Sequence, residues 1–153
     1  MSRHVEDIGA LNASQDPTEL IEGSIWWPPY CPFCDVSSDS VIAESRHALA
    51  IPDQYPVNPG HTLVIPRAHS RSLFTHSSEA QADIWHLVAK VRDHLQTSCN
   101  PDGFNIGIND GSAGGQTVNH AHIHVIPRFD GDVADPRGGI RWILPDRAAY
   151  WDQ

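Results

Sequence analysis

The sequence has no long apolar run and little positive charge. No segment approaches the roughly 18 consecutive apolar residues of a membrane span, and the first twenty residues lack the apolar core of a signal peptide. Lysine and arginine total 10 against 19 acidic residues, which gives a formal net charge of −9. A chain this acidic is poorly suited to grip a nucleic-acid backbone. We therefore expect no nucleic-acid partner, no membrane partner and a cytoplasmic location.

Cysteine is also scarce, with three residues among the 153. In a chain without an export signal, so few cysteines indicate reduced thiols or metal ligands rather than a disulfide framework. Cys31 and Cys34 form a C-x2-C pair, which is half of a tetrahedral zinc site. No second pair of finger type accompanies it, so spacing alone leaves the site incomplete. Two free thiols in a turn are the alternative.

The length and composition predict a single globular domain. Hydrophobic residues make up 40% of the chain and include five tryptophans, which is enough to build a core. Residues 1–24 are polar and acidic without a clear period, and we expect them to be an extension with little structure of its own. The domain then occupies residues 25–153.

Hydrophobic patterning predicts an α+β fold, with an antiparallel sheet of about five strands and one main helix. Strands are expected over residues 41–45, 47–53, 61–67, 104–110 and 120–128. The helix is expected to begin at a capping box of Ser78 and Gln81 and to end before Asn100. Apolar residues recur along it at helical spacing, namely Ile84, Leu87, Val88, Val91 and Leu95.

Three histidines alternate with apolar residues in the segment HAHIHV, residues 120–125. Alternation is the period of a strand, so the apolar residues should face a core and the histidines should share the other face. Neighbouring histidines then stand roughly 7 Å apart and the outer two about 13 Å apart, too far for one metal ion to bind all three. Either the row is divided between different tasks, or it binds a ligand longer than an ion.

A glycine-rich loop, GSAGGQ at residues 111–116, leads into the histidine row. Glycines allow positive φ and close approach to a ligand, and successive N–H groups there can bind an anion. Joined to a row of imidazoles, the loop predicts a phosphate site. An imidazole can also act as a nucleophile through one nitrogen while the other donates a hydrogen bond.

Two segments together resemble the histidine triad (HIT) family. GQTVNHAHIHVIPR, residues 115–128, is similar to its His-x-His-x-His signature, and NPGHTLVIPRAH, residues 58–69, is similar to its second signature. The similarity extends over about residues 31–145. It implies a nucleotide hydrolase or transferase that cleaves at an α-phosphorus through a nucleotidyl-histidine intermediate, and a homodimer.

The resemblance also assigns catalytic roles to individual residues. His122 corresponds to the nucleophile, and His124 to the histidine that contacts the reacting phosphate. His61 corresponds to a histidine that reaches the triad from the neighbouring strand. Gln116 corresponds to the residue that hydrogen-bonds the phosphate and arranges the leaving group or water.

Substrate and metal contacts follow from the same resemblance. Asn109 and Thr117 fall where the family contacts the phosphate chain, and Asp53 falls where it holds the ribose hydroxyls. Some bacterial members bind structural zinc through a similar CxxC and two histidines. The corresponding residues here are Cys31, Cys34, His69 and His120.

The expected substrate is a dinucleoside polyphosphate such as diadenosine tetraphosphate, hydrolysed at an α-phosphorus. Mg²⁺ can accompany such a substrate without a protein cage of its own, and no redox cofactor is called for. Three alternatives stay open. These are a nucleoside phosphoramidase, a phosphorylase that uses phosphate as the acceptor, and a non-catalytic nucleotide-binding or partner-binding module stabilised by zinc.

Overall fold

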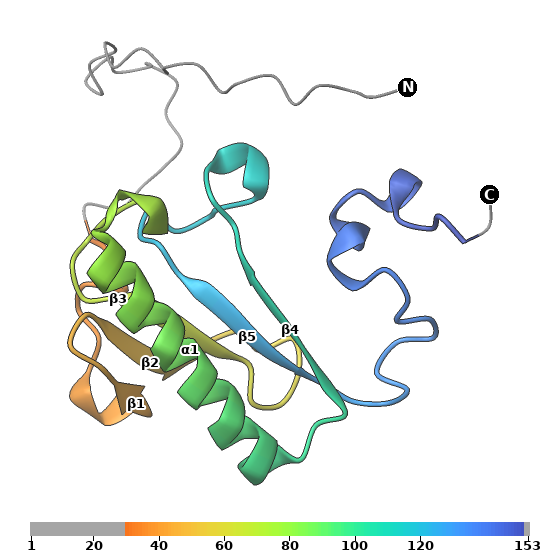
Figure 1. Ribbon diagram of the computed structural model, residues 1–153, viewed down its shortest axis with the longest axis horizontal. Helices are drawn as coiled ribbons and strands as arrows, with labels where there is room; N and C mark the ends of the chain where they lie inside the picture. The colour runs from red at the N-terminus through yellow and green to blue at the C-terminus, as the bar shows by residue number, and fades with distance from the viewer. Residues whose placement is uncertain (1–29, 152–153) are drawn as a thin grey trace, which may run out of the picture.

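One antiparallel sheet with a single long helix across one face forms the fold (Figure 1). The computed structural model describes residues 30–151, so the predicted extension at residues 1–24 lies outside the described part. The strand order is β1-β2-β3-β5-β4. The strands are β1 (Ala43–Glu44), β2 (Ala48–Pro52), β3 (Thr62–Pro66), β4 (Gly103–Ile108) and β5 (Ile123–Arg128). The α+β prediction of five strands and one main helix is confirmed.

The fifth strand begins later than its alternating pattern predicts. Residues 120–122 lie outside β5, which starts at Ile123. The reason is a competing hydrogen bond, because Ala121 N–H donates to the carbonyl of Ser70 in a loop, at 2.7 Å, instead of to a neighbouring strand. The apolar residues of the alternating pattern nevertheless behave as predicted, since Ala121, Ile123 and Val125 all lie in the main core.

The main core lies between the sheet and α1 (Ser78–Cys99). The helix is amphipathic and lies against β2, β3 and β5, as Figure 1 shows. Each residue predicted from the helical spacing is buried, together with apolar side chains of the sheet such as Val64, Ile123 and Val125. The helix ends at Cys99, with Asn100 in the left-handed conformation as its C-cap, before Pro101 as expected.

The N-cap residue of the helix lies one position earlier than the sequence pattern suggests. Ser77, not Ser78, is the N-cap residue, and its side chain accepts a hydrogen bond from Ala80 N–H at 3.2 Å. Gln81 does not complete a capping box with Ser78, because its side-chain amide donates to the carbonyl of His76 at 2.8 Å. The sequence pattern does not distinguish the two adjacent serines, and the hydrogen bond from Ala80 N–H to the Ser77 side chain identifies the cap.

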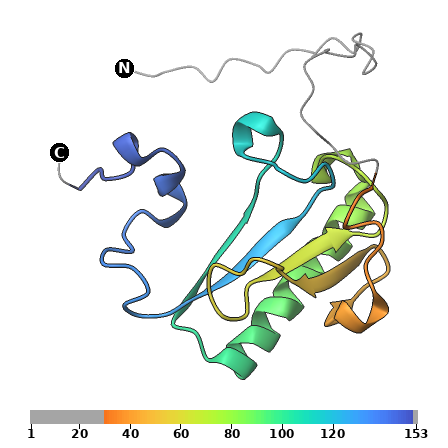
Figure 2. The same ribbon diagram turned by 180° about the vertical axis from the view of Figure 1, so that it is seen from behind.

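The opposite face of the sheet carries a smaller apolar cluster and the histidines. Figure 2 views the fold from behind, with the helix on the far side of the sheet. Buried Ile51, Leu63 and Ile65 form this cluster, with the half-buried side chains of Phe33 and Leu49 packed against it. The sheet therefore separates a dry core under the helix from a face on which polar side chains meet apolar ones.

Short 3-10 turns complete the described chain. They are η1 (Ser38–Ser40), η2 (Leu73–Thr75), η3 (Ser112–Gly114), η4 (Gly139–Ile143) and η5 (Pro145–Arg147). The last two belong to a C-terminal segment that extends beyond the β4 edge of the sheet (Figures 1 and 2). No helix within residues 30–151 is long and apolar enough to cross a membrane.

The adjacent serines at the start of α1 provide a matched test of the cap. Replacing Ser77 by alanine should lower the free energy of unfolding by about 1 kcal/mol, because the Ala80 N–H loses its partner. Ser78→Ala should change it by less than about 0.5 kcal/mol. Urea denaturation of both variants measures the difference, and equal losses would show that Ser77 is not the cap.

Candidate active site and metal site

Three neighbouring strands bring the polar side chains of the histidine face together. β2 pairs with β3, and β3 pairs with β5 in a register that sets Leu63 opposite His124. His61, two residues before Leu63, is therefore a diagonal neighbour of His124 on the same face. Asp53 N–H donates to His61 O at 2.9 Å, which continues the β2–β3 pairing to the end of the row. The prediction that His61 lies beside the triad from a neighbouring strand agrees with this geometry.

His122 is held by its own backbone. Its ring is buried, with the residue 5% exposed, and Nδ1 lies 2.8 Å from the carbonyl oxygen of His120. A carbonyl only accepts, so Nδ1 carries a proton and donates. The unshared electron pair of neutral His122 is then on Nε2, which has no hydrogen-bond partner among residues 30–151. This is the form of imidazole that a nucleophile requires.

His124 lies against His61 and the neighbouring triad ring. Its Nδ1 is 3.0 Å from His61 Nε2, and its ring centroid is 5.1 Å from that of His122. Burial lowers the pKa of His124 to about 4, and the nearby His122 and His61 rings contribute in the same direction. Burial also lowers the pKa of His61, although the carboxylate of Asp53 opposes the change. Both imidazoles are therefore neutral at pH 7.

The first histidine of the triad has a different environment. His120 is fully buried, and its Nε2 lies 2.9 Å from the carbonyl oxygen of Pro66, to which it donates. Its Nδ1 lone pair then faces the sulfur atoms of Cys31 and Cys34, at 3.4 and 3.6 Å. His69 Nδ1 lies 3.1 Å from the Cys34 sulfur. The four predicted zinc ligands thus meet in one place.

The donor set fits tetrahedral zinc. All four ligand atoms lie within 4.8 Å of one another. Bonds of about 2.3 Å to sulfur and 2.0–2.1 Å to nitrogen would separate N and S ligands by about 3.5 Å, close to the distances observed. Bound zinc would join the turn at Cys31 and Cys34 to the histidine row, and two thiolates with two neutral imidazoles are a structural rather than an open catalytic set.

The glycine loop is held closed by Gln116. Its side-chain oxygen accepts from Gly111 N–H at 2.9 Å, and its amide group donates to the carbonyls of Arg71 and Val118 at 2.8 and 3.1 Å. Gln116 therefore orders the loop in this structure. Asn109 is half-buried near Gly115, and Thr117 is exposed, so both lie at the loop where phosphate contacts are predicted.

Several contributors to the site were not predicted from the sequence. The Phe33 ring packs edge-on against His120 and His122, with centroid distances of 5.9 and 5.3 Å. The carbonyls of Pro66 and His120 fix which ring nitrogen is free. Phe33 was visible as the apolar residue inside the C-x2-C pair, but backbone acceptors cannot be found from residue types.

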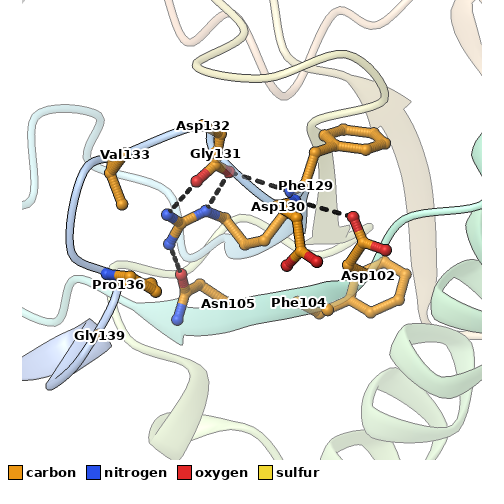
Figure 3. A pocket seen from close by; sticks show the side chains of 12 residues that line it. Asp102, Phe104, Asn105, Phe129, Asp130, Gly131, Asp132, Val133, Pro136 and Gly139 are labelled. Atoms are coloured by element: carbon orange, nitrogen blue, oxygen red, sulfur yellow. Dashed lines mark hydrogen bonds and ion pairs between the residues drawn. The ribbon is translucent and has the colours of Figure 1, made fainter.

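A separate pocket of about 250 Å³ lies at the other end of β4 and β5 (Figure 3). Asp102 and Asp130 are exposed at it, and neither belongs to the histidine row. The guanidinium of Arg128 is occupied by two contacts to Asp132, at 2.6 and 2.7 Å, and a third to Asn105. A pocket with two exposed carboxylates and a neutralised arginine is unfavourable for polyphosphate, so the histidine face is the candidate active site.

The sequence and the fold of this chain are similar to those of known proteins. A family model described as "HIT domain" matches residues 35–131, and the chain therefore belongs to the HIT family. The matched range contains every predicted catalytic and substrate-binding residue. The two cysteines of the candidate metal site precede it.

Individual relatives agree with this assignment. The chain is 37% identical to a zinc-bound histidine triad family protein from Mycobacterium smegmatis, with a TM-score of 0.62 over 69% of this chain and 79% of that one. A HIT family member from Bacillus subtilis has 34% identity and a TM-score of 0.62, over 67% and 75% of the two chains. An AP-4-A phosphorylase from Mycobacterium tuberculosis is 34% identical over 111 residues, which are 69% of this chain and 57% of that protein.

The metal site can be tested by its cysteines. Cys34→Ser should reduce bound zinc to well under one equivalent and lower the melting temperature, because the site loses a thiolate. Cys99→Ser is the matched control and should retain both, since Cys99 lies at the end of α1 outside the cluster. Elemental analysis of dialysed protein gives the stoichiometry. Equal zinc in the two variants would exclude this ligand set.

The lowered pKa of His124 predicts how stability depends on pH. In the unfolded chain a histidine has a pKa near 6.5, whereas the pKa of folded His124 is about 4. Between these values the unfolded state binds the additional proton, so the free energy of unfolding should fall as the pH decreases from 6.5 to 4. His124→Asn should make this decline shallower, and His94→Asn, at an exposed helix position, should not. Denaturation across the pH range compares the slopes.

Proposed function

We propose that this HIT protein hydrolyses dinucleoside polyphosphates, such as diadenosine tetraphosphate, at an α-phosphorus through a covalent intermediate on His122. One observation carries the proposal. His122 donates through Nδ1 to the carbonyl of His120, so its Nε2 is free to attack. His124 lies beside it and is neutral, with its own Nε2 unpartnered among the described residues.

The chemistry divides one displacement into two. His122 Nε2 attacks the α-phosphorus, the bond to the leaving phosphate oxygen breaks, and a nucleotidyl-histidine forms. Water then attacks the same phosphorus, which releases the nucleotide and restores the imidazole. Backbone N–H groups of the glycine loop, with Asn109 and Thr117, are the proposed donors to the phosphate oxygens. Gln116 is proposed to leave its loop contacts, or to act through them, when substrate binds.

The nucleoside has a suitable surface next to the histidines. Phe33 packs against His122 and also against the cluster that contains Ile51 and Leu63. This half-buried apolar surface suits a purine base. In the same proposal the polyphosphate brings its own Mg²⁺, because no carboxylate cage is needed for it. The homodimer and the cytoplasmic location stay predictions.

A phosphorylase is the second candidate, and the similarity to an AP-4-A phosphorylase favours it. The same intermediate would then be attacked by phosphate instead of water. With diadenosine tetraphosphate, water gives AMP and ATP, whereas phosphate gives ADP and ATP. Incubation of the purified protein with and without phosphate, followed by nucleotide chromatography, separates the two reactions. Adenosine 5′-phosphoramidate in a parallel reaction tests for a phosphoramidase.

The nucleophile has a direct test. His122→Ala should lower turnover by at least about 10⁴-fold while leaving nucleotide affinity within a few-fold, because the covalent step is lost and the surrounding donors remain. Mass spectrometry of quenched wild-type protein should detect one nucleotidyl group, absent from the variant. His94→Ala is the control and should behave as wild type. Undiminished turnover by His122→Ala would remove the assignment.

A further inference from the structure

A polyphosphate bound at the histidine row would need positive charge that the row itself does not provide. His61 and His124 are neutral at pH 7, because burial lowers the pKa of both imidazoles, so they offer hydrogen bonds without charge. The carboxylate of Asp53 lies 3.4 Å from His61 Nε2, and the whole chain has a formal charge of −9. A cationic side chain next to the row would therefore matter for any ligand with several phosphates.

The glycine loop has few N–H groups to spare for such a ligand. Those of Gly114, Gly115 and Gln116 donate to carbonyls within the loop, at 3.0–3.1 Å. Gly111 N–H donates to the side-chain oxygen of Gln116 at 2.9 Å. These four groups are already used, so the phosphates that lie beyond the reacting one need donors from another segment.

Most arginines in residues 30–151 are already occupied. Carboxylates lie within 3.1 Å of five of them, namely Arg46, Arg67, Arg92, Arg128 and Arg137. Arg141 donates to two main-chain carbonyls. Within this part of the chain, the basic side chains without a hydrogen bond or ion pair are Arg71, Lys90 and Arg147. These three can bind phosphate without first giving up a carboxylate.

Of these three residues, Arg71 is the one beside the glycine loop. Its carbonyl accepts from the side-chain amide of Gln116 at 2.8 Å. Figures 1 and 2 show η2, which follows Arg71, at the same end of the sheet as η3 of the loop. Lys90 lies on α1, on the sheet face opposite the histidines, and Arg147 lies in η5 beyond the β4 edge.

The main chain next to Arg71 is also joined to the histidine row. Ser70 O accepts from Ala121 N–H at 2.7 Å, directly before His122. The side chain of Arg71 is exposed, and no ion pair joins it to Asp110, the exposed carboxylate that precedes the loop. A fixed backbone with a long, unpaired side chain is suited to a ligand that lies over the loop.

We propose that Arg71 is a specificity-determining residue that binds the phosphates beyond the reacting one. The inference rests on the proposed function and names the part of the substrate that the site selects, which is a leaving group with a phosphate chain of its own. The guanidinium group has a planar fork of N–H donors that matches phosphate oxygens and carries the missing charge. Arg71 would therefore distinguish a dinucleoside polyphosphate from a phosphoramidate.

Nucleotide binding tests this role without turnover. In a His122→Ala background, ATP has two phosphates beyond the α-phosphate, whereas AMP has none. Arg71→Gln should weaken ATP binding by about 10-fold, because a charged hydrogen-bond donor is lost, and should leave AMP binding within about twofold. Arg71→Lys keeps the charge without the fork and should lose less. Isothermal titration calorimetry in the presence of EDTA measures each Kd without a contribution from Mg²⁺.

Arg147→Gln is the matched control, because it removes another exposed arginine without a partner in the described chain, far from the loop. It should leave both affinities unchanged. Equal losses for ATP and AMP in Arg71→Gln would overturn the proposal, and so would no loss for either. A loss of ATP binding in Arg147→Gln as large as that in Arg71→Gln would reduce the effect to net charge and would also overturn it.

Kinetics then compare leaving groups. Arg71→Gln should lower kcat/KM for diadenosine tetraphosphate by about 10-fold and should leave kcat/KM for adenosine 5′-phosphoramidate unchanged, because that leaving group has no phosphate. An equal loss for both would overturn the proposal. If the wild-type protein cleaves neither compound, the proposed function fails, and the comparison of ATP with AMP still decides the role of Arg71. If Arg71→Gln cleaves the tetraphosphate as well as the wild type does, the role of Arg71 fails and the proposed function stands.

Discussion

Two backbone carbonyls determine what the histidine row can do. Pro66 O accepts from one nitrogen of His120, and His120 O accepts from one nitrogen of His122. Each bond fixes a tautomer, and the tautomer decides which lone pair is free. His120 presents Nδ1 to the cysteines, whereas His122 keeps Nε2 free. Without these two acceptors, nothing would fix which nitrogen of His120 faces the cysteines and which nitrogen of His122 keeps its lone pair free.

Burial enforces this division. The rings lie on a sheet whose other face is covered by the core of α1, and the desolvated environment lowers the pKa values of His61, His120 and His124. A neutral imidazole has one proton. A hydrogen bond that fixes one ring nitrogen as donor or acceptor therefore fixes the opposite role for the other nitrogen. The placement of His61 also depends on Gly60, with φ of +84°, where a Cβ would lie 3.1–3.2 Å from Cys99, Leu95 and Pro127. Glycine is thus required for the turn that brings His61 to the row.

The sequence predicted the fold class, the strands and helix in outline, and the grouping of Cys31, Cys34, His69 and His120. The fold class and the elements follow from periodicity, whereas the grouping of the four metal ligands was implied by the resemblance to the HIT family. It misplaced the start of β5, because the hydrogen bond from Ala121 to Ser70 is a contact between distant segments. The prediction of Ser78 as the helix cap was also wrong, because local propensity does not distinguish Ser77 from Ser78. The tautomers depend on main-chain groups, for which no residue pattern exists.

The hydrogen bonds of the three triad histidines show how rings that are too widely spaced for one metal ion are divided between different tasks. Three imidazoles at this spacing cannot all reach one metal ion, and their bonded nitrogens also point to different partners. His120 Nδ1 faces two sulfur atoms, His122 Nδ1 faces a carbonyl, and His124 Nδ1 faces His61. A single ion could collect the three rings only by breaking bonds that are already made in a poorly solvated site, where an unpaired polar group is costly. A metal of the thiolate-preferring kind is therefore directed to the cysteine end, and the other two histidines stay available for the proposed phosphate chemistry.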